Sequence, residues 1–182
     1  MSLAPTPGQT VGPFFHYALP YPGDNELVPS GHPSRIRLHG TVFDGNGMPI
    51  PDALIEIRQA DTDGSIPTAP GSLRRDGFTF TGWGRAKTDR VGHYSFSTVT
   101  PGATRPGEAP FFAVCVFARG LLDRLLTRAY VPGHENLDDA VLSGVDAGRR
   151  ATLIAVPDDT GYRFDIHLQG DSETVFLQHW KS

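Results

Sequence analysis

Alternation between apolar and polar side chains is the feature that most constrains the fold of this chain. Over residues 36–43 the apolar side chains take every second position, which is the period of a β-strand with one buried face. The sequence Asp-Gly-Asn-Gly follows at 44–47, and these residues favour a tight turn because Gly and Asn tolerate positive φ. Residues 53–57 are again strand-like. The pattern therefore predicts a β-hairpin at this point of the chain.

Short strand patterns separated by turn residues continue to the end of the sequence. The further strands are predicted at residues 93–99, 111–117, 127–131, 151–156, 162–168 and 174–177. Residues 111–117 are apolar throughout, which predicts a strand buried on both faces. The one helix expected spans 136–142, with Asn136 as its N-cap. Many short strands with little helix predict an all-β protein, a sandwich or a barrel, and we favour the β-sandwich.

The first 34 residues differ from the rest because they are rich in Pro and Gly. Proline fixes φ and lacks an N–H, so this stretch is neither a long helix nor a central strand. It could be a solvated tail, but it also carries several large apolar side chains, including Phe14 and Phe15, which a tail has little use for. We therefore expect an N-terminal arm over 1–34 that docks on this chain or on a partner, followed by a β-sandwich domain over 35–182.

Charge and cysteine content exclude several classes of protein. The 182 residues include 16 Lys and Arg against 20 Asp and Glu, a net charge of −4, which argues against nucleic-acid binding. Cys115 is the sole cysteine, so neither an intrachain disulfide nor a cysteine-based metal site is expected. The N-terminus does not resemble a signal peptide, and no apolar run is long enough to cross a membrane. These observations predict a cytoplasmic location.

The sequence contains no recognisable catalytic set of its own. No two of the seven histidines are two to four residues apart, so a local chelating pair is absent, although a site assembled from distant residues stays open. We interpret His39, His93 and His167 as structural. Cys115 lies inside an apolar run, where burial raises a thiol pKa and lowers its reactivity. No catalytic residue is therefore assigned to this chain alone.

Eight ordered segments resemble the intradiol ring-cleaving dioxygenases. They begin with TPGQTVGPFF at 6–15, and the others are residues 40–47, 56–64, 94–102, 117–122, 126–130, 162–170 and 173–176. In this family a non-haem Fe(III) is held by two tyrosines and two histidines, and phenolate oxygens suit such a hard ion. The metal activates a catechol toward O2, and the ring opens between the carbons that bear the hydroxyl groups.

The resemblance places none of the four metal ligands in this chain. The two tyrosine positions fall at Ile66 and near Thr104, and the His-x-His positions fall at Phe111 and Ala113. No metal and no other cofactor is therefore expected on this chain. Tyr130 and the tyrosine at 162 match neither ligand position and are interpreted as structural.

The resemblance is strongest to the metal-free α type of subunit in the protocatechuate-cleaving branch of the family. It implies a hetero-oligomer with a homologous β subunit that carries the Fe(III), acting on protocatechuate and O2 to give 3-carboxy-cis,cis-muconate in the β-ketoadipate pathway of aromatic catabolism. No nucleic acid or membrane partner is implied. The residues implied to line the shared substrate pocket are Thr10, Gly12, Pro13, Phe14 and Arg119. Relatives often carry tyrosine where this chain has Phe14.

Two other functions compete with this one. Residues 40–57 also resemble transthyretin-like or carboxypeptidase-regulatory-like modules, which are β-sandwiches that bind without catalysis. A one-chain catechol or hydroxyquinol dioxygenase is rejected, because those enzymes carry their own four ligands and an N-terminal helical segment for dimerisation. The binding module remains the alternative.

Overall fold

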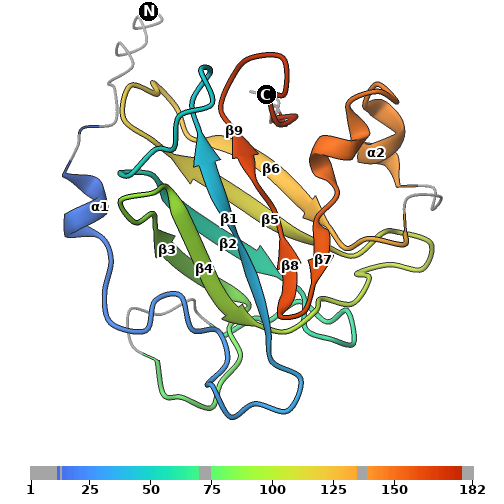
Figure 1. Ribbon diagram of the computed structural model, residues 1–182. Helices are drawn as coiled ribbons and strands as arrows, with labels where there is room; N and C mark the ends of the chain where they lie inside the picture. The colour runs from blue at the N-terminus through green and yellow to red at the C-terminus, as the bar shows by residue number, and fades with distance from the viewer. Residues whose placement is uncertain (1–11, 13, 70–74, 135–138, 178–182) are drawn as a thin grey trace, which may run out of the picture.

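Two facing β-sheets form the body of the protein in the computed structural model, which describes residues 12, 14–69, 75–134 and 139–177 (Figure 1). The first sheet has the strand order β4-β1-β8-β7, and β9 also pairs with β1. Its strands are β1 (Ile36–Phe43), β4 (His93–Thr98), β7 (Val156–Asp158), β8 (Gly161–Arg163) and β9 (Ile166–His167). The second sheet has the order β3-β2-β5-β6 and is antiparallel throughout. Its strands are β2 (Leu54–Gln59), β3 (Trp83–Lys87), β5 (Phe111–Phe117) and β6 (Leu125–Tyr130).

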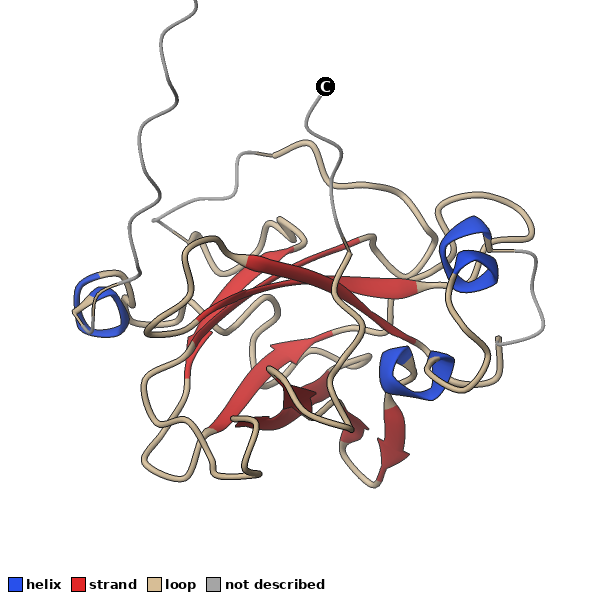
Figure 2. Cartoon of the chain, turned by 90° about the horizontal axis from the view of Figure 1, so that it is seen from above, coloured by secondary structure: helices blue, strands red, loops and turns tan. Residues whose placement is uncertain are grey.

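The core lies between these two layers, which Figure 2 shows from above. Alternate residues of the central strands point inward, including Leu38 of β1, Ile57 of β2, Phe96 of β4 and Val114 of β5, and each is at most 2% exposed. Burying one such side chain contributes about 1.5–3 kcal/mol. The predicted all-β sandwich with little helix is confirmed.

The predicted hairpin between residues 36–43 and 53–57 is wrong, although the turn is present. The Asp44 carboxylate accepts hydrogen bonds from the backbone N–H groups of Asn46 and Met48, and Gly47 has a φ of 75°. However, β1 pairs with β4, and β2 belongs to the other sheet. The chain returns beside β1 only briefly, where Pro49 forms an antiparallel bridge with Phe43 and the N–H of Ile50 donates to the carbonyl of Val42. Pro51 follows and has no N–H to continue a ladder, and the chain then crosses to the other sheet.

The helical segments also differ from the prediction. Helix α2 spans Ala140–Gly144, and its N-cap is Asp139, whose carboxylate accepts from the N–H groups of Val141 and Leu142. The expected cap, Asn136, lies outside the described residues. A short helix α1 (Phe15–Ala18) and a 3₁₀ turn η1 (Arg150–Leu153) were not predicted. The 3₁₀ turn takes the first half of the strand expected at 151–156, because a short apolar run does not by itself distinguish a strand from a helical turn.

Three predicted strands need further correction. Strand β5 is buried on its inner face only, because the outer face of its sheet lines a cavity. The strand expected at 162–168 is broken into β8 and β9, since the Asp165 carboxylate accepts from the N–H of Thr41 where a ladder bond would otherwise form. Residues 174–177 form no strand, although the N–H of Leu177 donates to the carbonyl of Leu126.

The described part of the N-terminal region packs on this chain. Helix α1 lies at the outside of the sandwich (Figure 1), with the Phe15 ring 6.5 Å from that of Phe117, at the end of β5. The Arg85 Nη1 atom donates to the carbonyl of Leu19 just after the helix, at 2.9 Å. Farther along, Leu27 is buried in the main core. No helix among the described residues is long and apolar enough to cross a membrane.

Candidate functional site

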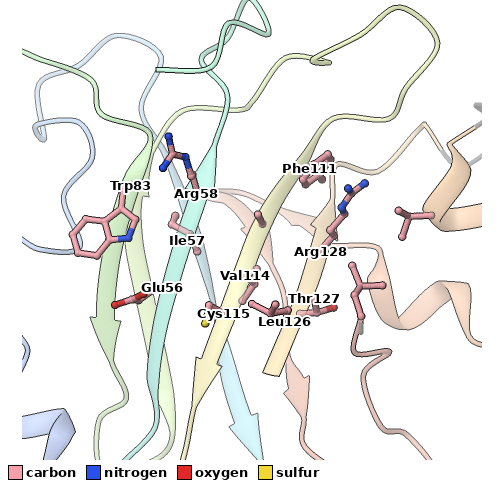
Figure 3. A pocket seen from close by; sticks show the side chains of 13 residues that line it. Glu56, Ile57, Arg58, Trp83, Phe111, Val114, Cys115, Leu126, Thr127 and Arg128 are labelled. Atoms are coloured by element: carbon pink, nitrogen blue, oxygen red, sulfur yellow. The ribbon is translucent and has the colours of Figure 1, made fainter. Parts of the chain in front are cut away.

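The outer face of the second sheet carries a cavity of about 590 Å³ (Figure 3). Strands β2, β3, β5 and β6 form its floor, and Val141 and Leu177 contribute from outside the sheet. The lining is mainly apolar, and the charged side chains present are Glu56, Arg58 and Arg128. A cavity of this size and character is typical of a small-molecule site.

Phe111 and Ala113, the two residues at the expected histidine positions, both line this cavity. They are two residues apart on β5, so their side chains point to the same face of the sheet. Ile66 and Thr104, the residues at the expected tyrosine positions, are not part of the lining. The Ile66 side chain is 60% exposed in a loop, and the Thr104 hydroxyl donates to Glu108 at 3.1 Å. The structure therefore brings together two of the four predicted positions.

Arg128 is the main charged group of the cavity that sequence reasoning missed. Its guanidinium carbon lies 3.9 Å from the centre of the Phe111 ring, a cation–π contact between β6 and β5 (Figure 3). Its Nη1 atom donates to the Tyr130 hydroxyl at 3.0 Å and lies 3.8 Å from the Asp139 carboxylate. Because Asp139 is also the N-cap of α2, this network holds the arginine between the sheet and the helix.

Glu56 and Cys115 lie in neighbouring positions of the cavity floor, opposite each other on β2 and β5. Glu56 is paired with Arg85, whose Nε and Nη2 atoms donate to the same carboxylate oxygen at 2.9 and 2.6 Å. Burial, assisted by the negative charge of Glu56, raises the pKa of the Cys115 thiol to about 11. The thiol is therefore protonated at neutral pH and is a poor nucleophile.

The side chains present do not fit a ferric ion. Isoleucine, phenylalanine and alanine have no donor atom, and the Thr104 hydroxyl is bonded to Glu108. The Arg128 guanidinium would repel a metal cation beside Phe111. Within 12, 14–69, 75–134 and 139–177, no three His, Cys, Asp or Glu residues are grouped as a metal site would require. No step of the chemistry is therefore assigned to iron on this chain.

Five residues were predicted to line a shared pocket, and two of them, Thr10 and Pro13, fall outside the described residues. The other three are not part of the cavity lining. Gly12 is exposed, and Phe14 precedes α1 with 75% of its surface exposed. Arg119 follows β5 in a turn, where its Nη2 atom lies 2.6 Å from the Asp52 carboxylate. The structure thus gives Arg119 a partner that the sequence did not reveal.

A pair of histidines on the opposite sheet was also missed. His39 on β1 and His93 on β4 have ring nitrogens 3.4 Å apart, and the other nitrogen of His39 is 2.6 Å from Asp158. Burial and the neighbouring His39 lower the pKa of His93. The two are 54 residues apart in sequence, so local spacing could not have found them.

Comparison with known proteins places this arrangement in a family. The chain matches the family described as Dioxygenase over residues 11–170, and it belongs to the intradiol dioxygenase family. It is 38% identical over 195 residues to the protocatechuate 3,4-dioxygenase alpha chain of Burkholderia cepacia, a match that covers 97% of this chain and 98% of that one. The resemblance predicted from the eight segments is thereby confirmed.

Two further comparisons extend this result. The chain is 32% identical over 183 residues to the protocatechuate 3,4-dioxygenase beta chain of the same species, covering 84% of this chain and 74% of that one. Among solved structures, it resembles the dioxygenase domain of a dioxygenase–carbohydrate-binding protein fusion from Streptomyces sp. SirexAA-E. That match has a TM-score of 0.58 and 26% identity, and covers 92% of this chain and 99% of the other.

Proposed function

We propose that this chain is the metal-free α subunit of a protocatechuate 3,4-dioxygenase. The observation that carries the proposal is the lining of the cavity beside β5. The β-sandwich is present, but Phe111 and Ala113, which line this cavity, have no side-chain atom that could bind a metal. The near-complete coverage of an alpha chain from Burkholderia cepacia supports the same assignment. Its contribution to the reaction is then to complete a substrate pocket whose chemistry is located on another chain.

The proposed partner is a homologous β subunit that holds a non-haem Fe(III). The existence of separate alpha and beta chains among the relatives supports a hetero-oligomer. Exposed aromatic side chains at the start of the described arm, Phe14 at 75% and Tyr17 at 71% exposed, also favour a contact with a partner. In this proposal the arm, residues 1–34, reaches the substrate pocket of the partner while residues 35–182 provide the docking scaffold.

The proposed reaction is the cleavage of protocatechuate by O2 to 3-carboxy-cis,cis-muconate. The iron of the partner would activate the catechol for attack by O2. This chain would supply the rim of the pocket through Thr10, Gly12, Pro13 and Phe14 and a positive charge through Arg119. Phe14 offers an apolar ring and no hydroxyl, so it can exclude water but cannot donate a hydrogen bond to the substrate.

The test is reconstitution with an iron-bearing β subunit. We expect O2 consumption and formation of 3-carboxy-cis,cis-muconate only when the two chains are produced together, and no turnover from this chain alone. Turnover by this chain without a second polypeptide would reject the proposal. So would a stable lone monomer that neither binds the β subunit nor changes its activity.

The alternative of a non-catalytic transthyretin-like module is less well supported. It explains residues 40–57, whereas the dioxygenase family matches residues 11–170. A lone chain with no affinity for any β subunit is the result that would favour this alternative.

A further inference from the structure

We propose that Asp52 is a positioning residue, which holds the Arg119 guanidinium in place to bind the carboxylate of an aromatic acid. The inference rests on the proposed function, because the substrate would sit in a pocket shared with the partner. The relevant observation is the 2.6 Å contact between Arg119 Nη2 and the Asp52 carboxylate.

The pair joins the two chain segments that lie next to one end of a strand ladder. Leu54 of β2 is opposite Phe117 of β5 in an antiparallel ladder. Asp52 lies two residues before the start of β2, and Arg119 lies two residues after the end of β5, so both residues flank the same end of this ladder. The ladder therefore brings these two segments together, and the ion pair joins them.

A tight turn presents Arg119 at the end of this ladder. The N–H of Leu121 donates to the carbonyl of Ala118, and Gly120 takes a φ of 92°, as the third residue of a type II turn requires. Arg119 is the second residue of that turn. Its side chain therefore extends from a tight turn directly after β5, and not from a long loop.

Burial differs strongly between the two partners. The Asp52 side chain is 10% exposed, whereas the Arg119 side chain is 61% exposed. A buried carboxylate requires a counter-charge, and Asp52 has this one ion pair in the described structure. Arginine has five N–H donors, so the contact through Nη2 leaves others free to bind a second carboxylate.

The arm is anchored on the same sheet. The Phe15 ring packs near Phe117, two residues before Arg119. Arg85 joins the Leu19 carbonyl to the Glu56 carboxylate of β2, the strand that begins two residues after Asp52. The arm and Arg119, predicted separately as pocket residues, are thus both attached near the outer face of this sheet.

The negative charge of Asp52 and its contact with Arg119 predict opposite effects of removing Asp52 on the binding of an anionic substrate. By its charge alone, Asp52 repels a carboxylate, so Asp52→Asn would tighten the binding of an anionic substrate. If Asp52 instead holds Arg119 in position, the same substitution frees the guanidinium and weakens binding. The sign of the change therefore separates the two effects.

The experiment uses the co-produced αβ complex and compares protocatechuate with catechol, which has the same two ring hydroxyls but no carboxylate. We expect Asp52→Asn to raise KM for protocatechuate about five- to tenfold, with little change in KM for catechol or in kcat for either compound. Arg119→Gln should raise KM for protocatechuate at least as much, and Asp52→Asn should add little to it in the double variant. Asp123→Asn, which removes an exposed acid four residues beyond Arg119, is the matched control and should change neither value.

Three results would overturn the inference. An unchanged or lower KM for protocatechuate in Asp52→Asn contradicts positioning, as does an equal rise in KM for both substrates, which indicates a general structural defect. If Asp52→Asn does not assemble, Arg119→Gln tests the same contact, and an unchanged KM for protocatechuate in that variant contradicts the inference. A wild-type complex that is inactive on both compounds would instead reject the proposed function, and this inference with it.

Discussion

Arg128 places its guanidinium 3.9 Å from the centre of the Phe111 ring, at the strand position where metal-bearing relatives are expected to carry a histidine. A positive charge held by the fold thus lies over the ring of Phe111, one of the two positions predicted to correspond to histidines. The arginine is held by the Tyr130 hydroxyl and lies near Asp139, so it is part of the fold rather than a mobile surface group. The lack of donor atoms at Phe111 and Ala113 and the presence of this cation both disfavour a metal ion in the cavity.

Introducing histidines at both positions of β5 should create a weak metal site that Arg128 opposes. In Phe111→His/Ala113→His the two imidazoles would point into the cavity, because the residues are two apart on one strand. Adding Arg128→Gln should strengthen Ni²⁺ binding about tenfold or more, since it removes a nearby positive charge. Calorimetric titration with Ni²⁺ measures this difference.

The control for this experiment is Arg90→Gln in the same double-histidine background. Arg90 is exposed in the turn between β3 and β4, so its removal changes the net charge equally. Equal Ni²⁺ affinities with and without Arg128 would show that its charge does not oppose a metal in this cavity.

Cys115 should react slowly with alkylating agents at neutral pH. Its pKa is raised to about 11 by burial and by Glu56, against an ordinary value of 9.0, so about a hundredfold less thiolate is present at pH 8. The rate of carbamidomethylation, followed by mass spectrometry, should rise tenfold per pH unit up to about pH 11. Glu56→Gln should shift this profile to lower pH, and a rate equal to that of a free thiol such as glutathione at pH 8 would contradict the assignment.

Arg85 should control the order of the arm. It joins Glu56 and the Leu19 carbonyl, and its side chain is 13% exposed. In Arg85→Gln the Glu56 carboxylate loses its partner, which should cost about 2 kcal/mol of folding free energy. Hydrogen exchange at the amides of α1 should accelerate more than exchange in β1.

Arg90→Gln again serves as the matched control, because it removes an exposed arginine without a carboxylate partner in the described structure. Faster exchange in α1 for both variants alike would mean that the loss of charge, not the contact with Leu19, governs the arm.

His93 should make the protein less stable in mild acid. Its pKa is lowered from 6.5, chiefly by burial and then by His39, so below pH 6.5 the unfolded chain binds more protons than the folded one. Stability should therefore fall as the pH drops from 7 through the lowered pKa. Urea midpoints between pH 5 and 7.5 should show a weaker pH dependence in His93→Gln, while His32→Gln, a change outside the pair, should retain the wild-type slope. The same slope in all three proteins would rule out this role for His93.

The sequence predicted the fold where the pattern is local. Strand β1 matches the alternation over 36–43, and β5 matches the apolar run over 111–117. The pairing of β1 was not predictable in the same way, because its partner β4 lies some 50 residues farther along. A turn motif indicates that the chain bends, but the prolines after it decide which sheet the chain enters next.

The part of the site that could be predicted from the sequence is the residue type at each position that corresponds to a family ligand. The absence of donors at Phe111 and Ala113 could be read directly, and the structure places both in one cavity. The cation over Phe111 and the carboxylate beside Arg119 come from other strands, so no local spacing reveals them. Thr10 and Pro13 remain predictions, since they lie outside the described residues.

The most direct test of the account is the iron content and visible absorption of this chain purified without a partner from iron-supplemented cells. We predict a colourless protein with far less than one iron atom per chain, because neither phenolate nor imidazole donors are present at the ligand positions. A burgundy protein with a tyrosinate-to-iron absorption band and one iron per chain would contradict the central claim that the metal is held elsewhere.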